Sequence, residues 1–164
     1  MSASASLEIR EAVWADPIHC EGVVDVLDSY ASDPIGGGKG LPPDARARLV
    51  PLLRDHPCTE VLLALEDGAP VGLAVCVAVI STFAARPVLN VADLAVLPTH
   101  RGRGIGHALL RAAEARARAQ GCASLSLEVQ DQNAPARRLY ARFGFADLVI
   151  GDAGPTRYLR KPIA

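Results

Sequence analysis

The sequence predicts a single mixed α/β domain that spans residues 1–164. Three observations support this fold class. Strand-like and helix-like segments alternate in the order β-α-α-β-β-β-α-β-α-β-β, without a repeat or a domain boundary. The length of 164 residues suits one domain of ordinary size. Hydrophobic residues form 50% of the chain and charges of both signs are mixed, which excludes a disordered chain.

The first third of the chain predicts a strand followed by two helices. Residues 7–13 alternate apolar and charged side chains, which is typical of a strand with one buried face. Asp16 stands before a proline, so we expect it to cap the first helix. Residues 33–43 are rich in glycine and proline and predict a mobile loop. We expect Asp44 to cap the second helix, which Pro51 breaks or kinks.

The middle of the chain predicts three strands and a long helix. Residues 60–65 and 71–82 are apolar runs separated by a short turn, so they predict a hairpin. Residues 90–97 predict another strand. After a turn, residues 105–120 carry apolar side chains at helical spacing and predict an amphipathic helix.

The last third predicts three more strands and one helix. Residues 124–129 predict a strand and residues 134–143 a helix. Two further strands are expected at residues 145–150 and 157–161. They complete the element order on which the fold class depends.

Composition excludes several functional classes. The net charge of −1 argues against a dedicated nucleic-acid-binding protein. The longest apolar run, residues 71–80, is well short of the ~20 residues that a membrane helix needs. No basic segment followed by an apolar stretch marks a secretory signal. The four cysteines lack C-x-x-C spacing, and no zinc pattern is present. We therefore expect a cytoplasmic protein with reduced thiols and no metal.

A glycine-rich turn between a strand and a helix is the most informative segment. Gly102, Gly104 and Gly106 let successive backbone N–H groups converge at the helix N-terminus. Arg101 and Arg103 add positive charge, so the segment suits a phosphate or pyrophosphate. It lacks the Gly-Lys-Ser/Thr ending of a Walker loop and the spacing of a dinucleotide motif. A plain tight turn is the alternative.

A second constellation follows the predicted strand 124–129. Glu128 lies near the end of that strand, and Asn133 caps the next helix. Tyr140 stands seven residues after Asn133, and a Phe-Gly-Phe sequence closes the helix. The strand end and the helix start thus bring together a carboxylate, an amide and a phenol.

Together the two segments resemble the GCN5-related N-acetyltransferase (GNAT) superfamily. Its Arg/Gln-x-x-Gly-x-Gly/Ala signature corresponds to Arg101, Gly104 and Gly106. Its later motif is matched at Asn133, Ala136, Leu139, Tyr140, Gly144 and Phe145. The strict likeness covers residues 89–147. It implies a central, mostly antiparallel sheet flanked by helices, with a splayed parallel pair made by strands 90–97 and 124–129.

The resemblance also implies acetyl-CoA as co-substrate and gives roles to individual residues. Leu94, Ala95 and Val96 would pair with the pantetheine arm as an added strand does. Backbone N–H groups of the turn would hold the pyrophosphate; this set is Arg101, Gly102, Arg103, Gly104, Ile105, Gly106 and His107. Asn133 would hydrogen-bond the arm. Tyr140 would contact the coenzyme and protonate the departing thiolate as general acid.

The general base is expected to be Glu128. Many members of the superfamily carry a glutamate where this chain has Ala92, so that assignment fails here. Asp93 points to the opposite face of its strand by alternation, which favours a structural role. Glu128 lies twelve residues before Tyr140, a spacing shared with ribosomal-protein N-terminal acetyltransferases that use this glutamate. It would act directly or through a water.

The acceptor is expected to be a primary amine, first of all that of a small molecule. In the superfamily the acceptor site is shaped by the first two helices, their loop and the last hairpin, which correspond here to residues 30–43 and 150–157. Tyr30 and Asp33 in the first of these segments would face a cationic amine; the alternative is that Asp33 only forms the turn, where Asp is common. Alternatives are a protein N-terminus or lysine, a non-catalytic acyl-CoA sensor and, last, a nucleotide-dependent oxidoreductase. The resemblance also allows a homodimer.

Overall fold

The computed structural model describes residues 6–152 and 154–163. The chain divides into two compact units, Met1–Leu127 and Glu128–Ala164. The expectation of one domain over the whole chain stays a prediction.

From residue 6 onward, the first unit forms a five-stranded sheet and three α-helices. Its elements are β1 (Leu7–Glu11), α1 (Pro17–Ser32), α2 (Pro43–Asp55), β2 (Thr59–Glu66), β3 (Ala69–Ser81), β4 (Arg86–Val96), α3 (Ile105–Ala119) and β5 (Leu125–Ser126). Neighbouring strands follow the order β1-β2-β3-β4-β5. The β4–β5 pair is parallel and the other pairs are antiparallel. The mixed α/β fold class is therefore confirmed.

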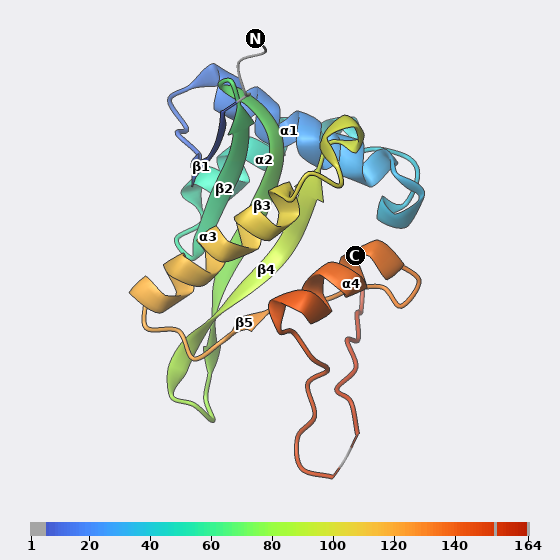
Figure 1. Cartoon of the computed structure of the whole chain (residues 1–164). Coiled ribbons are helices and arrows are strands. Elements are labelled where there is room, and N and C mark those ends of the chain that lie inside the picture. The colour runs from blue at the N-terminus through green and yellow to red at the C-terminus, as the bar shows by residue number, and fades with distance from the viewer. Residues whose placement is uncertain (1–5, 153, 164) are drawn as a thin grey trace. The chain divides into compact units, whose positions relative to one another are not determined.

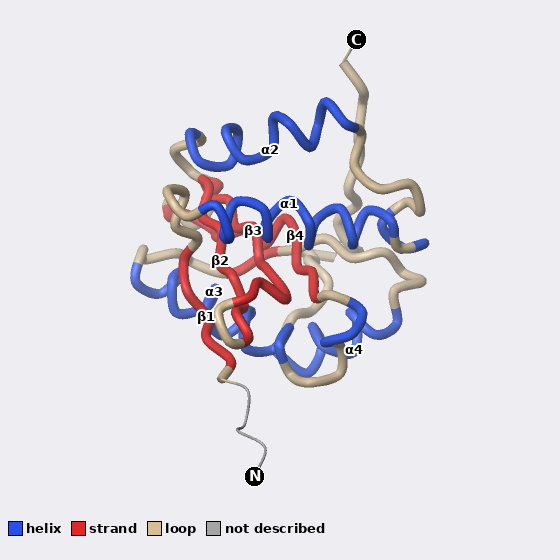
Figure 2. Tube along the Cα trace, turned by 90° about the horizontal axis from the view of Figure 1, so that it is seen from above, coloured by secondary structure: helices blue, strands red, loops and turns tan. Residues whose placement is uncertain are grey.

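The sheet of the first unit lies between two layers of helices. Helices α1 and α2 cover one face and α3 covers the other (Figures 1 and 2). Val61, Leu63 and Leu65 of β2 are buried in one cluster with α1. Leu62 and Ala64 alternate with them, so their buried side chains face α3. The near-continuous apolar run of β2 thus reflects burial on both faces.

The predicted start of α1 is confirmed, whereas that of α2 is wrong. The Asp16 side chain accepts a hydrogen bond from the N–H of Ile18 at 2.9 Å. Helix α2 has Pro42 as its N-cap residue, without a side-chain cap. Asp44 lies in the first turn and pairs with Arg48 instead, at 2.5 Å. Pro51 is accommodated, because α2 continues to Asp55.

Three predicted strands differ from the observed structure. The strand expected at residues 124–129 is only Leu125–Ser126. Residues 145–150 and 157–161 form no strand; a single bridge joins Val149 and Pro155. A strand needs a partner ladder and a buried face, and in this segment Leu148 and Leu159 remain exposed. In the part of the second unit that the structure describes, the helix is α4 (Ala134–Phe143), with the bounds predicted from the sequence.

Candidate active site

Strand β4 carries a bulge near its centre. Asp93 lies opposite Val75 of β3, whereas Val91 lies opposite Cys76. Ala92 between them is therefore an additional residue on β4 without its own partner on β3. A bulge bends the strand and increases its local twist, so β4 changes direction at Ala92.

Beyond the bulge, the second edge of β4 is open. Strand β5 pairs only with Leu89 and Asn90. No strand in the described part of the chain pairs with that edge from Val91 to Val96. The N–H of Leu97 donates to Val71 at 2.9 Å, and backbone direction alternates along a strand. Leu94 and Val96 consequently direct their N–H and C=O groups away from β3, toward the open edge.

The chain then forms the glycine turn at the start of α3. Gly102 and Gly104 have positive φ angles of 75° and 81°, and Gly104 is the N-cap residue of α3. Glycine adopts this left-handed conformation without steric cost. Helix geometry leaves the N–H groups of Ile105 and Gly106 without an acceptor inside α3. Aligned N–H groups at a helix N-terminus favour the binding of a phosphate.

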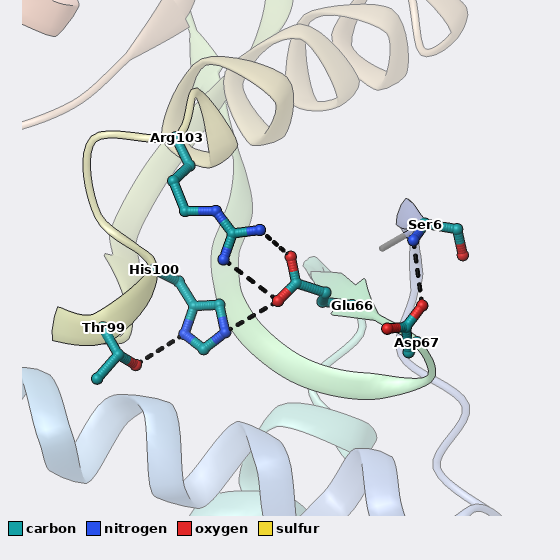
Figure 3. Close-up of polar contacts among 6 residues, drawn as sticks. All are labelled: Ser6, Glu66, Asp67, Thr99, His100 and Arg103. Atoms are coloured by element: carbon teal, nitrogen blue, oxygen red, sulfur yellow. Dashed lines mark hydrogen bonds and ion pairs between the residues drawn. The ribbon is translucent and has the colours of Figure 1, made fainter. Parts of the chain in front are cut away.

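Glu66, the last residue of β2, contacts two basic residues of this turn. Figure 3 shows its carboxylate between the Arg103 guanidinium and the His100 ring. One Arg103 Nη donates to Glu66 Oε2 at 3.2 Å, and His100 Nε2 lies 3.1 Å from that oxygen. The hydrogen bond from Arg103 lowers the pKa of Glu66 more than its burial raises it. The opposite ring nitrogen of His100 contacts Thr99.

Asp33 neutralises the third basic residue, Arg101. The Arg101 guanidinium donates to Asp33 Oδ2 at 2.9 Å and to the carbonyl oxygen of Val96 at 3.0 Å. The N–H of Ile35 lowers the pKa of Asp33, and Arg101 lowers it further. The attraction of this turn for an anion therefore depends first on its backbone N–H groups, because carboxylates already offset its arginine charges.

The acceptor residues expected from the sequence lie on the α1 side of the sheet. Burial raises the pKa of the Tyr30 hydroxyl, and the charges of Asp93 and Asp33 raise it further. Asp93 shares a sheet face with Val75, its partner, which packs against α1. Alternation along β4 predicts the face of Asp93 only relative to Ala92. The bulge resets the alternation and puts Asp93 on the α1 side, from where its charge reaches Tyr30.

The second unit positions Asn133 and Tyr140 on one helix. Asn133 is the N-cap residue of α4, and its Oδ1 accepts a hydrogen bond from Ala136 at 3.2 Å. The half-buried Tyr140 ring forms a T-shaped pair with Phe145, with 5.8 Å between ring centroids. Glu128 is exposed and lies two residues beyond the end of β5, outside any strand.

The described residues also bear on metal binding, membrane spans and thiol chemistry. Within 6–152 and 154–163, no group of three His, Cys, Asp or Glu residues could hold a metal ion. Among the same residues, no helix is long and apolar enough to span a bilayer. Cys76 is buried in the sheet, and that burial raises the pKa of its thiol to about 12. A thiol in this environment is a poor nucleophile.

The open edge of β4 and the glycine turn offer backbone groups in one continuous segment, and groups of these two kinds suit extended amides and phosphates respectively. Residues 23–145 match the model of the acetyltransferase (GNAT) family. The chain belongs to this family, and the predicted resemblance is confirmed.

Two relatives show how far sequence similarity extends. A streptothricin acetyltransferase of Streptomyces lavendulae is 50% identical over 58 residues, which are 35% of this chain and 31% of that protein. The chain thus spans about a third of the length of that relative. The uncharacterized N-acetyltransferase YhfO of Bacillus subtilis (strain 168) is 31% identical over 103 residues, covering 63% of this chain and 68% of YhfO.

Solved structures share the fold at low identity. A possible acetyltransferase from Clostridium difficile 630 has a TM-score of 0.79 at 19% identity, covering 96% of this chain and 99% of its own. The aminoglycoside acetyltransferase AAC(6')-Iy, solved with a bisubstrate analog, has a TM-score of 0.74 at 19% identity; the match covers 97% and 100% of the two chains. These likenesses show the GNAT fold.

Proposed function

We propose that this protein transfers the acetyl group of acetyl-CoA to a primary amine of a small molecule. The observation that carries the proposal is the open edge of β4 after Ala92, which leads directly into the glycine turn. An extended thioester with a pyrophosphate needs both features in this order. Family membership supports acetyl-CoA-dependent N-acetyl transfer as the class of reaction.

Coenzyme binding is assigned mainly to the backbone of β4 and of the turn. Leu94 would hydrogen-bond an amide of the pantetheine arm, and Val96 would offer its N–H to the thioester carbonyl beyond it, with Ala95 between them. The pyrophosphate would be bound by the N–H groups of the turn residues Arg101, Gly102, Arg103, Gly104, Ile105, Gly106 and His107. Asn133 would donate from its side-chain amide to the arm, a role compatible with its helix cap.

The chemical step is acyl transfer without a covalent enzyme intermediate. Acetyl-CoA supplies the activated thioester when bound. Glu128, directly or through a water, takes a proton from the ammonium, because only the neutral amine has a lone pair. The Val96 N–H polarises the carbonyl oxygen as the N–C bond forms. The C–S bond then breaks, and Tyr140 protonates the thiolate to yield the amide and free coenzyme A.

A small molecule is the proposed acceptor class for two reasons. Two curated relatives are streptothricin acetyltransferases, from Streptomyces lavendulae and Escherichia coli. On the α1 side of the sheet, Asp93 also adds a carboxylate whose charge reaches Tyr30, and negative charge attracts a cationic amine. Cytoplasmic location and a homodimeric assembly stay predictions.

The test is release of coenzyme A over a panel of amines. The panel contains streptothricin, aminoglycosides, polyamines, peptides with free N-termini and peptides with internal lysines. We expect turnover with at least one small amine and none with the peptides. Turnover with peptides alone would replace the proposal by protein acetylation. Acetyl-CoA binding measured by calorimetry, without turnover of any amine, would identify an acyl-CoA sensor.

A further inference from the structure

Arg101 connects three segments of the first unit that are distant in sequence. It belongs to the glycine turn, and its Nε donates to the carbonyl oxygen of Val96 at the end of β4. Its Nη1 donates to Asp33, which is 68 residues earlier in the chain. The Arg101 guanidinium therefore contacts β4, the strand proposed to bind the coenzyme, and also the loop between α1 and α2, residues 33–42. Planar guanidinium groups are suited to such paired hydrogen bonds.

Asp33 determines how the α1–α2 loop begins. Its N–H donates to Tyr30 at 3.1 Å and closes α1, and its Oδ1 accepts from Ile35 at 3.1 Å. Its carbonyl oxygen accepts from Gly36 at 2.8 Å and from Gly38 at 3.0 Å. The first half of the loop is thus bonded to a single residue, so a displacement of Asp33 displaces this half with it.

The first half of the loop also packs closely on α1. A Cβ added to Gly36 would lie 1.9 Å from the carbonyl oxygen of Tyr30, which leaves no room for the loop to approach further. At the other end, the N–H of Leu41 donates to Asp28 at 2.7 Å, and Arg46 pairs with the same carboxylate at 2.6 Å. The α1–α2 loop is therefore held at both ends. At its first end, the contact to Asp33 comes from Arg101 of the glycine turn.

We infer that Arg101 and Asp33 form a positioning pair that couples coenzyme binding at the turn to the α1–α2 loop on the acceptor side. The inference rests on the proposed function, since it needs acetyl-CoA to bind the turn. Phosphate contacts to the N–H groups of the turn restrain the backbone of Arg101, and its side chain restrains Asp33. Coupling between two binding sites is reciprocal, so bound amine would also raise the affinity for acetyl-CoA.

The Asp33→Asn substitution tests the pair, because an amide keeps the shape and loses the charge. Hydrogen exchange of residues 33–42 is measured with and without saturating acetyl-CoA. We expect the coenzyme to slow exchange in the wild-type loop and to leave the variant loop nearly unchanged. The KM for the amine should rise about three-fold, with kcat and the Kd of acetyl-CoA close to wild type, since exposed ion pairs have modest effects.

The matched control is Asp55→Asn at the end of α2. This change also removes a carboxylate that binds an arginine, because Asp55 accepts from Arg54 at 2.7 and 3.0 Å. It should leave the exchange of the α1–α2 loop and its response to acetyl-CoA unchanged. If Asp33→Asn unfolds the chain, Arg101→Lys replaces it, since a lysine cannot contact Val96 and Asp33 with the same geometry.

The outcomes separate this inference from the proposed function. Absence of acetyl-CoA binding to the wild-type chain would refute the proposed function and the inference with it. If acetyl-CoA binds and protects the turn but leaves exchange in residues 33–42 unaltered, the inference alone is wrong. The inference is also wrong if acetyl-CoA slows hydrogen exchange in residues 33–42 of Asp33→Asn as strongly as in wild type.

Discussion

The glycine turn of the first unit and helix α4 of the second unit hold their predicted site residues in different ways. The turn is fixed by backbone conformation and by two carboxylates, Glu66 and Asp33, that come from other elements. Helix α4 has no fully buried residue and is stabilised locally, by the cap at Asn133 and by contacts among aromatic rings. The proposed coenzyme site, which consists of backbone groups, therefore lies in the first unit with its buried core. The proposed catalytic side chains, Glu128 and Tyr140, lie in the smaller second unit.

This difference predicts that substitutions in the two regions change different constants. Changes in the turn should alter the Kd of acetyl-CoA, because the turn would bind the phosphates. Changes of Tyr140 and Glu128 should alter kcat and its dependence on pH. The following experiments test that separation, from the largest expected effect to the smallest.

The largest effect is expected for Tyr140→Phe. The substitution removes the proposed general acid and keeps the ring that contacts Phe145. General acid catalysis contributes about 10²–10⁴-fold, so kcat should fall at least about 100-fold, with little change in the Kd of acetyl-CoA. Tyr158→Phe, at an exposed tyrosine of the same unit, is the control. An unchanged kcat would mean that Tyr140 only orients the coenzyme.

Glu128→Gln should have the second-largest effect. Without the proposed base the enzyme depends on amine that is already neutral, so activity at neutral pH should fall about ten-fold or more. Activity should recover as pH rises, which shifts the pH–rate profile toward high pH. Glu8→Gln, at an exposed glutamate of β1, should leave the profile unchanged. The same profile in Glu128→Gln and wild type would exclude Glu128 as base.

Gly104→Ala should weaken coenzyme binding about ten-fold. A left-handed residue with a Cβ costs about 1–2 kcal/mol, and about 1.4 kcal/mol corresponds to a factor of ten in Kd. Gly121→Ala is a matched control, because Gly121 also has a positive φ of 69° and open space around its missing Cβ. In Gly104→Ala the turn relaxes from the left-handed conformation and coenzyme binding must restore it, whereas Gly121→Ala should leave the Kd of acetyl-CoA unchanged, because Gly121 lies beyond the other end of α3. Equal losses of acetyl-CoA affinity, measured by calorimetry, would contradict the assignment of the turn.

The comparison also explains what could be predicted from the sequence. The turn and helix α3 depend on local signals, namely glycines at a helix start and apolar residues at helical spacing. The bulge at Ala92 depends on the register between β3 and β4, which no single segment contains. The pairs Arg101–Asp33 and Arg103–Glu66 join residues 68 and 37 positions apart, so no spacing rule indicates them.

The failed strand predictions have a related cause. Residues 145–150 and 157–161 contain apolar side chains that are typical of strands. Periodicity describes one strand, whereas a ladder needs a partner and a surface to cover its apolar face. In the second unit the exposed Leu148, Tyr158 and Leu159 have no such cover among its described residues. Local signals were sufficient for α4 because a capped helix satisfies its own backbone.

The smallest effect is expected for Glu66→Gln. This substitution tests whether the carboxylate that holds the glycine turn matters for coenzyme binding. The variant loses the charged contact that holds the turn, and it also releases the Arg103 charge that Glu66 offsets. Because the anion site depends mainly on the backbone shape of the turn, the KM for acetyl-CoA should rise about two- to three-fold with little change in kcat. A fall in KM would mean that the released charge outweighs the shape. Glu114→Gln, which removes the exposed pair with Arg118 on α3, should change neither constant.

The pH dependence of stability gives an independent test of Glu66. Its pKa in the folded chain lies below the usual value of 4.5, mainly because Arg103 donates to it. A lowered pKa contributes stability that is complete above the unfolded pKa and is lost as pH falls through the folded one. Wild type should therefore have a higher Tm than Glu66→Gln at pH 7, and the difference should shrink only below about pH 4.5. A difference that stays constant through this acid range would mean that the charge of Glu66 does not hold the turn.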